Sequence, residues 1–228
     1  DRAPPKAHAM TPVELIGWAA AVVGTLLGVP QVIRLARTRS VAGLSMPAWQ
    51  AILALNLAWT SHGIILAKAN MIVPNLLGLA STLPVLVMMA RELGRPLGRV
   101  LLPGVLVAAV MIGVDLIFGT VVFGGFAIFP ALFANLGQCV ELVRSPSVAG
   151  VSPVFLIGGV INQMLWLAWR LLVPDAGTII TACVTLSVIS FNLLWWIMRR
   201  LGLRSFGVPT RDEVRAYVRA RARAGTPS

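Results

Sequence analysis

Long apolar stretches alternate with short polar segments along the whole chain, and this pattern predicts membrane-spanning helices. Each stretch reaches the length of about 20 residues that a helix needs to cross a hydrocarbon core. Seven stretches have this character, with approximate bounds: Val13 to Ile33, Pro47 to Ala67, Met71 to Ala90, Val100 to Phe118, Val121 to Leu142, Pro153 to Leu172 and Thr178 to Met198. The predicted fold class is an all-α membrane protein with seven transmembrane helices.

The sequence also repeats itself. Gln31 to Ser45 reads QVIRLARTRSVAGLS, and Gln138 to Ser152, 107 positions further on, reads QCVELVRSPSVAGVS. The same register relates Trp59 to Trp166 without a gap, which indicates duplication of one structural unit. The offset places the first three helices over the last three. We therefore expect two parallel three-helix repeats joined by a linker helix (3+1+3), with a pseudo-two-fold axis along the membrane normal.

Composition and charge agree with a membrane protein. Hydrophobic residues make up 57% of the chain and charged residues 12%, which leaves too little polar surface for a soluble domain. Fifteen basic residues fall on one predicted side of the membrane and four on the other, namely Arg2, Lys6, Lys68 and Arg170. The positive-inside rule then places the N-terminus outside and the C-terminus in the cytoplasm, and we expect the protein in the cell membrane. The net charge of +11 reports this topology and contact with anionic lipids, not nucleic acid.

The predicted organisation has five parts. They are an N-terminal extracellular segment (1–12), a first three-helix repeat (13–90), a linker helix (91–119), a second three-helix repeat (120–198) and a basic cytoplasmic tail (199–228).

The repeated segment carries a recognisable motif. Pro30-Gln31 precedes basic residues and the run SVAGLS at Ser40–Ser45, and the second copy reads Gly137-Gln138. This segment resembles the PQ-loop motif of the SWEET, SemiSWEET and cystinosin-like transporters, and the seven-helix arrangement is similar to that of SWEET sugar carriers. The resemblance implies a facilitative transporter of a small neutral solute, with a sugar as the first expectation, that works by alternating access between the two repeats.

Helix-weakening residues recur at related places in the two repeats. Pro30 has no N–H group and clashes with the preceding turn, so it loosens the inner half of the first helix. Pro47 and Pro153 begin the second and sixth helices. Prolines are also ordinary in membrane helices, so a structural role stays open. The predicted hinge or gate residues are Pro30, Gln31, Pro47, Gln138 and Pro153.

Trp59 and Asn75 form the predicted substrate site. An indole face offers a platform to the CH-rich face of a sugar, and an amide offers donors and acceptors to hydroxyl groups. SWEET carriers place an asparagine sixteen residues after a site tryptophan, and this chain has that spacing. Trp166 matches Trp59 in the second repeat, whereas Asn75 is matched by Ala182. The predicted substrate-binding residues are Trp59, Asn75, Trp166, Asn56 and Thr181.

Ionisable groups inside the predicted helices suggest proton sites. His62 lies one turn from Trp59 and Asp115 lies near the outer end of the fourth helix. The alternative roles are an interfacial histidine and an aspartate that reaches water. Arg170 is expected to extend its side chain to the outer surface. The axis between the repeats is therefore predicted to be neutral.

Several function classes find no support in the sequence. It has no Walker loop, nucleophile elbow, CxxC or HExxH motif, so we expect no enzyme activity, no metal and no cofactor. The expected partners are a small-molecule substrate, most simply a sugar, and membrane lipids, and homo-oligomerisation stays open. Two alternatives also stay open: a proton-coupled amino-acid carrier of the cystinosin type, and a non-transporting receptor on the same scaffold.

Overall fold

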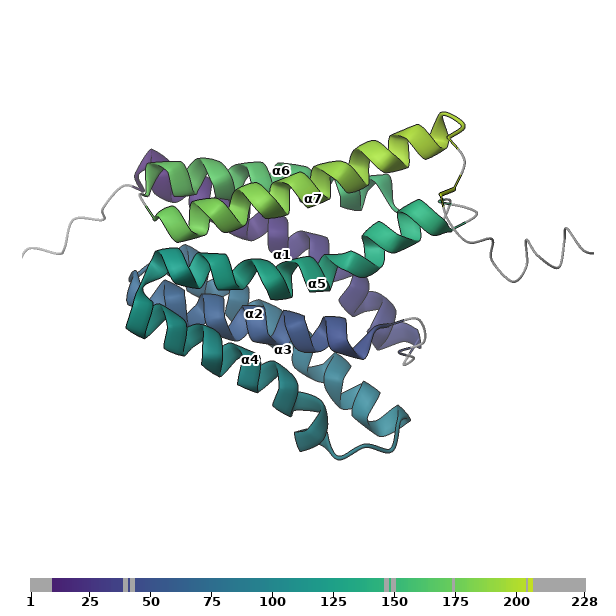
Figure 1. Ribbon diagram of the computed structural model, residues 1–228, viewed down its shortest axis with the longest axis horizontal. Helices are drawn as coiled ribbons and strands as arrows, with labels where there is room; N and C mark the ends of the chain where they lie inside the picture. The colour runs from purple at the N-terminus through teal and green to yellow at the C-terminus, as the bar shows by residue number, and fades with distance from the viewer. Residues whose placement is uncertain are drawn as a thin grey trace, which may run out of the picture.

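The seven predicted helices are all present. A computed structural model describes residues 10–38, 41, 44–145, 148, 151–173, 175–203 and 205–206, and within these ranges all regular structure is helical (Figure 1). The helices are α1 (Pro12–Thr38), α2 (Met46–Ile65), α3 (Ala69–Glu92), α4 (Leu97–Phe118), α5 (Thr120–Arg144), α6 (Pro153–Leu172) and α7 (Ala176–Arg200). The predicted fold class is confirmed, whereas most of the N-terminal segment and of the basic tail lies outside the described residues.

Six of the helices form a closed ring. Helix α3 packs between α1 and α2, and α7 packs between α5 and α6. The two halves meet where α1 packs on α6 and α2 packs on α5. The 107-residue offset maps α1, α2 and α3 onto α5, α6 and α7, so it exchanges these two contacts with each other, as a pseudo-two-fold axis through the ring requires. Helix α4 lies outside the ring, against α2, α3 and α5 (Figure 1).

Six helices are long and apolar enough to cross a membrane, and α2 is the exception. Its length of 20 residues is sufficient, but it carries Gln50, Asn56 and His62. Because α2 packs against α3, α4 and α5, protein rather than lipid surrounds these polar groups. Helix α1 begins and α7 ends at opposite ends of the bundle, as an odd number of crossings requires (Figure 1). We call these the α1-start end and the α7-finish end.

The repeated motif builds the same helix start twice. The hydroxyl groups of Ser45 and Ser152 accept hydrogen bonds from the backbone N–H groups of the third residue after each, at 3.4 and 3.3 Å, and so cap α2 and α6. Val41 and Val148, four residues before each cap, are buried. The Val41 N–H also donates to the carboxylate of Glu92 at the end of α3. The motif thus fixes how the chain turns into the second helix of each repeat. Gly43 and Gly150 lie outside the described residues.

Glycines at equivalent positions face the third helix of each repeat, and in the second repeat the two backbones approach closely. A side chain at Gly124 in α5 would collide with the backbone of Gly177 in α7. At the equivalent place in the first repeat, a side chain at Gly17 in α1 would collide with Asn70 in α3. Glycine is needed at Gly124 because the obstacle there is backbone, whereas at Gly17 the obstacles are the side chains of Asn70 and Trp169. Both crossings lie at the α1-start end.

Candidate substrate site and charge cluster

Trp59 and Trp166 contact the same cation. The guanidinium carbon of Arg170 is 5.1 Å from the ring centroid of Trp59 and 5.5 Å from that of Trp166, both in cation–π geometry. The pseudo-two-fold axis exchanges the two tryptophans, so a group that contacts both lies close to the axis. Phe123 and Trp169 pack edge-on against Trp59 and Trp166, at 5.0 and 5.8 Å. The two predicted aromatic positions are therefore part of one aromatic cluster.

The expectation that Arg170 reaches the outer surface is wrong. The residue is only 8% exposed, although it lies in the last turn of α6. Side chains on a helix lean toward its N-terminus, which for α6 means back into the bundle and onto the indole of Trp166. Within the described part of the chain Arg170 makes no ion pair, and its Nε has no hydrogen-bond partner. A buried cation on the axis also overturns the prediction of a neutral axis.

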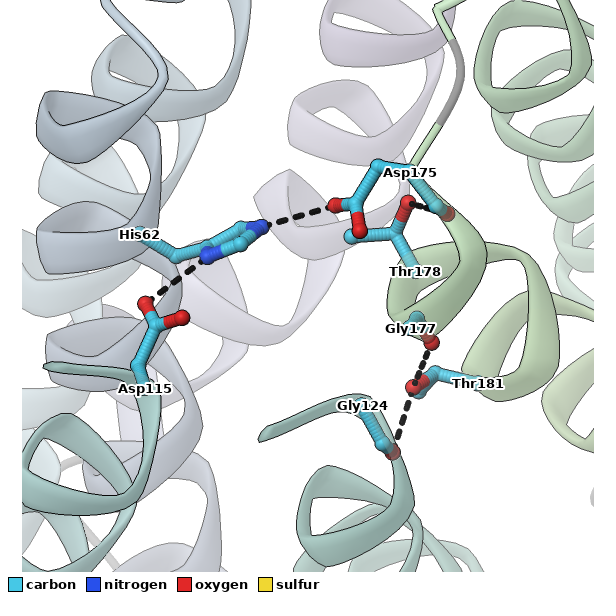
Figure 2. Close-up of polar contacts among 7 residues, drawn as sticks. All are labelled: His62, Asp115, Gly124, Asp175, Gly177, Thr178 and Thr181. Atoms are coloured by element: carbon cyan, nitrogen blue, oxygen red, sulfur yellow. Dashed lines mark hydrogen bonds and ion pairs between the residues drawn. The ribbon is translucent and has the colours of Figure 1, made fainter. Parts of the chain in front are cut away.

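His62 links two buried carboxylates. Its Nδ1 lies 2.8 Å from Oδ2 of Asp115 and its Nε2 lies 2.9 Å from Oδ2 of Asp175 (Figure 2). The histidine is fully buried, so it is not at the interface, and Asp115 is 6% exposed, so it does not simply reach water. The imidazole also stacks on Phe123, with ring centroids 4.6 Å apart. The two predicted proton-site candidates are thus in direct contact.

The geometry of this cluster requires a proton. A neutral imidazole has one N–H, so it can donate to only one of two ionised carboxylates, and its other nitrogen would face an oxygen lone pair. Both contacts become hydrogen bonds if His62 is an imidazolium or if one aspartate is protonated. The carboxylates of Asp115 and Asp175 lie on opposite sides of the ring (Figure 2). In the part of the chain that the structure describes, no three potential metal ligands form a metal site.

Asp175 is the residue that connects this cluster to the second repeat. It precedes α7 and accepts a hydrogen bond on its main-chain oxygen from the Thr178 hydroxyl (Figure 2). Burial by itself would raise the pKa of Asp175, but the hydrogen bond from His62 and the positive charge of an imidazolium there act against it, and the pKa is lowered to about 2. The carboxylate is therefore ionised at neutral pH. Its second oxygen, Oδ1, is buried and has no hydrogen-bond partner among the described residues.

The other predicted substrate-binding residues use their polar groups within the helix bundle. Asn56 donates to the Thr82 hydroxyl at 3.2 Å, and Asn75 donates to the carbonyl of Met71, one turn earlier in α3. Thr181 donates to the carbonyl of Gly124 in α5, at 2.7 Å, next to the α5–α7 crossing (Figure 2). Asn56 and Asn75 remain partly accessible, whereas Thr181 is buried and serves helix packing.

The predicted hinge residues lie toward the α7-finish end. Pro30 is exposed within α1, and Pro47 and Pro153 are exposed in the first turns of α2 and α6. Gln138 is half-buried in α5. Gln31 lies within α1, but its side chain is outside the described residues. These positions are compatible with a hinge, and their role stays a prediction.

Arg170 and Asp175 were missed as members of a site. In the repeat register, Arg170 corresponds to Gly63 and Asp175 corresponds to Lys68. Each position thus changes its charge between the repeats while the surrounding pattern persists. That divergence is the signal by which the sequence could have located them.

Comparison with known proteins places the motif and the fold. Residues 12–61, which cover α1 and most of α2, match the family model described as PQ loop repeat. The solved structure of a eukaryotic SWEET transporter superposes with a TM-score of 0.65 over 84% of this chain and all of that chain, at 12% sequence identity. No curated protein matches the sequence significantly. Residues 12–61 therefore contain a PQ-loop repeat, and the chain has the fold seen in that SWEET transporter structure. The six long apolar helices agree with an integral membrane protein.

Proposed function

We propose that this protein is an alternating-access carrier that moves a small solute through the axis between its two three-helix repeats. The observation that carries the proposal is the pairing of Trp59 and Trp166, which come from equivalent places in the two repeats and both contact Arg170. In this proposal residues 13–90 and 120–198 move as units about the linker 91–119. The α1-start end faces outward and the basic α7-finish end faces the cytoplasm of the cell.

A sugar is the first candidate for the solute. The flat faces of the two indoles would hold the CH-rich face of a sugar ring, and the partly accessible amides of Asn56 and Asn75 would bind its hydroxyl groups. Pro30, Pro47 and Pro153 would supply the flexibility for opening at the cytoplasmic side. Pro30 removes a backbone N–H within α1, and Pro47 and Pro153 lie in the first turns of their helices. Gln31 and Gln138 would line the gate at that end.

Counterflow into proteoliposomes tests this function. A panel of labelled sugars, sugar acids, amino acids and small monocarboxylates is offered to wild-type protein and to Trp59→Ala and Trp166→Ala. We expect uptake of at least one solute and a loss of more than about tenfold in each variant, because each removes one wall of the site. Trp18→Ala is the matched control, since Trp18 lines an apolar groove on the outside of α1 and α3. Equal losses in all three variants, or no uptake of any solute by folded protein, would contradict the proposal.

A second candidate is proton-coupled transport, and the His62 cluster is the observation that favours it. The proton between His62 and the two carboxylates holds α4, α2 and the start of α7 together. Its release would break one of the two hydrogen bonds and loosen the contact between the repeats at this end. Accumulation of solute above equilibrium under an imposed proton gradient, absent in His62→Gln, supports coupling. Uptake that only equilibrates under the same gradient supports a facilitative carrier.

A further inference from the structure

We propose that Arg170 binds a carboxylate group of the transported solute between the indoles of Trp59 and Trp166. This inference rests on the proposed carrier function and names the chemical class of its substrate. The starting point is that the guanidinium is buried without the partners such a group requires. It has five N–H donors, none of them hydrogen-bonded to a described residue, and Nε is completely shielded.

The two indoles hold this cation in place but do not satisfy its donors. Cation–π contacts act on the face of the guanidinium, whereas its hydrogen-bond donors project from the edge. Since both indoles contact the guanidinium through its π face, its edge is left for a planar acceptor. A carboxylate matches that edge with two parallel hydrogen bonds, which a sugar hydroxyl cannot do. The geometry therefore selects a carboxylate over a neutral sugar at this point of the site.

The carboxylate of Asp175 does not already fill this role. One of its oxygens is held by His62, and the other has no partner, yet no ion pair with Arg170 forms within 4.0 Å. The two groups are close enough for the charge of Asp175 to act on Arg170. A buried cation and a buried carboxylate oxygen thus lie near each other, and both have unused hydrogen-bonding capacity.

The charges of the cluster define how different carboxylates would be accommodated. Arg170 and the bridging proton at His62 balance Asp115 and Asp175, so an arriving carboxylate adds one negative charge. An amino-acid zwitterion brings its own compensation, because its ammonium group can use the free Oδ1 of Asp175. A simple monocarboxylate or a sugar acid requires an additional proton, so its binding should strengthen at lower pH.

The test compares each carboxylate with its neutral counterpart. Quenching of tryptophan fluorescence and counterflow are measured for alanine and alaninamide, lactate and lactamide, and glucuronate and glucose. The wild-type protein is expected to bind at least one carboxylate about 10- to 100-fold more tightly than its counterpart, the range expected for a charge-assisted pair. Arg170→Gln should abolish that preference. Arg170→Lys should retain part of it, because the charge remains but the planar fork is lost.

A matched control and a folding check complete the experiment. Lys68→Gln removes a cation from the same end of the bundle, at the position equivalent to Asp175, and should leave the preference unchanged. If Arg170→Gln is not recovered as monodisperse protein, the test rests on Arg170→Lys with the same ligand pairs. A reduced carboxylate preference in that variant supports the assignment, and an unchanged preference overturns it. Transport of glucose without any carboxylate preference would overturn the assignment and leave the carrier function intact. An equal loss of transport for charged and neutral solutes in both Arg170 variants would mean that Arg170 acts as a gate and not as a carboxylate-binding residue. That result would also overturn the assignment. No transport of any solute would instead contradict the carrier function itself.

Discussion

The two repeats share a backbone and a set of structural residues. Ser45 and Ser152 cap equivalent helices, and Gly17 and Gly124 stand at equivalent positions where the first and third helices of each repeat meet. Trp59 and Trp166 occupy equivalent places beside one cation. The residues that stayed alike since the duplication are therefore mostly those that shape and hold the fold.

The residues that differ between the repeats gather at the α1-start end of the axis. His62 corresponds to Trp169, Gly63 to Arg170 and Lys68 to Asp175. An ionisable side chain thus replaces an aromatic one in the first pair. In the second pair a cation replaces a residue without a side chain, and in the third an acid replaces a base. The comparison teaches that the chemistry of the site arises from what the duplication did not preserve, and each prediction below tests one side of it.

The largest effect is expected at the shared helix crossing. Gly124→Val places a side chain against the backbone of Gly177, which cannot move aside as a flexible side chain would. Overpacking against side chains typically costs about 1–3 kcal/mol, but the obstacle here is backbone, so the cost should exceed that range and every effect predicted below. We expect loss of monodisperse protein in size-exclusion chromatography. Gly125→Val is the control, since a side chain at Gly125 meets nothing within 4 Å. Normal behaviour of both variants would mean that the crossing is not tight.

The next largest effect is expected at the divergent cluster. Asp175→Asn leaves a buried imidazole with one carboxylate partner in place of two, and breaking a buried pair typically costs about 3–5 kcal/mol. The thermal unfolding midpoint in detergent should fall accordingly. Lys68→Asn, at the equivalent position of the first repeat, should change the midpoint little, because no buried partner depends on it. Similar falls in the unfolding midpoint of both variants would contradict the view that only the second-repeat position holds a buried ionic contact.

The pH dependence of stability separates the members of the same cluster. The pKa of Asp175 is lowered, so its contribution is fully present above its ordinary value of 3.8 and is lost only as the pH falls toward about 2. Between about pH 5 and 8, the range in which histidines ordinarily titrate, Asp175 stays ionised. The groups facing His62 are Asp115 from α4 and Asp175 before α7, with Arg170 nearby on α6. We expect the unfolding midpoint to fall as the pH rises through this range, and to be flat in His62→Gln. A flat wild-type profile would rule out a labile bridging proton.

The smallest effect is expected at the shared caps. Ser45→Ala and Ser152→Ala each remove one hydrogen bond at an exposed helix start, and loss of such a cap costs about 1 kcal/mol. The two variants should lower the unfolding midpoint by similar amounts, because the two caps have nearly the same geometry. A large difference between them would show that the motif has different structural roles in the two repeats.

The fold could be predicted from the sequence because its signals are long and repeated. Seven apolar stretches set the number of helices, and the register of the QVIRLARTRSVAGLS segment set the relation between the halves. Helix α2 is not among the six helices apolar enough to be a candidate span, yet its apolar stretch from Pro47 to Ala67 was long enough to predict it. Such signals extend over tens of residues, so local exceptions do not hide them.

The site could be predicted only in part. Trp59 was proposed from its spacing to Asn75 and Trp166 from the repeat, and the structure brings both against Arg170. The direction of the Arg170 side chain was not predicted, because it depends on which helices surround the last turn of α6. Asp175 lies between two helices, where no periodic pattern indicates burial. The partners of Asn75 and Thr181 are carbonyl groups, whose accessibility depends on packing and not on residue type. Sequence patterns therefore located the elements of the site better than its contacts.

The single chain makes possible a site that identical halves could not form. In a symmetric pair built from two copies of the second repeat, every ionisable side chain beside the axis would face a copy of itself. Two guanidinium groups would then repel each other across the axis. An imidazole could not bridge two aspartates that come from non-equivalent positions, as His62 does here. Covalent fusion removes this restriction, because a residue in one repeat can be substituted without a change at the equivalent position of the other repeat. The single cation that contacts both Trp59 and Trp166 thus makes the two halves resemble the unlike subunits of a heterodimer. Such a site suits a ligand whose two ends differ.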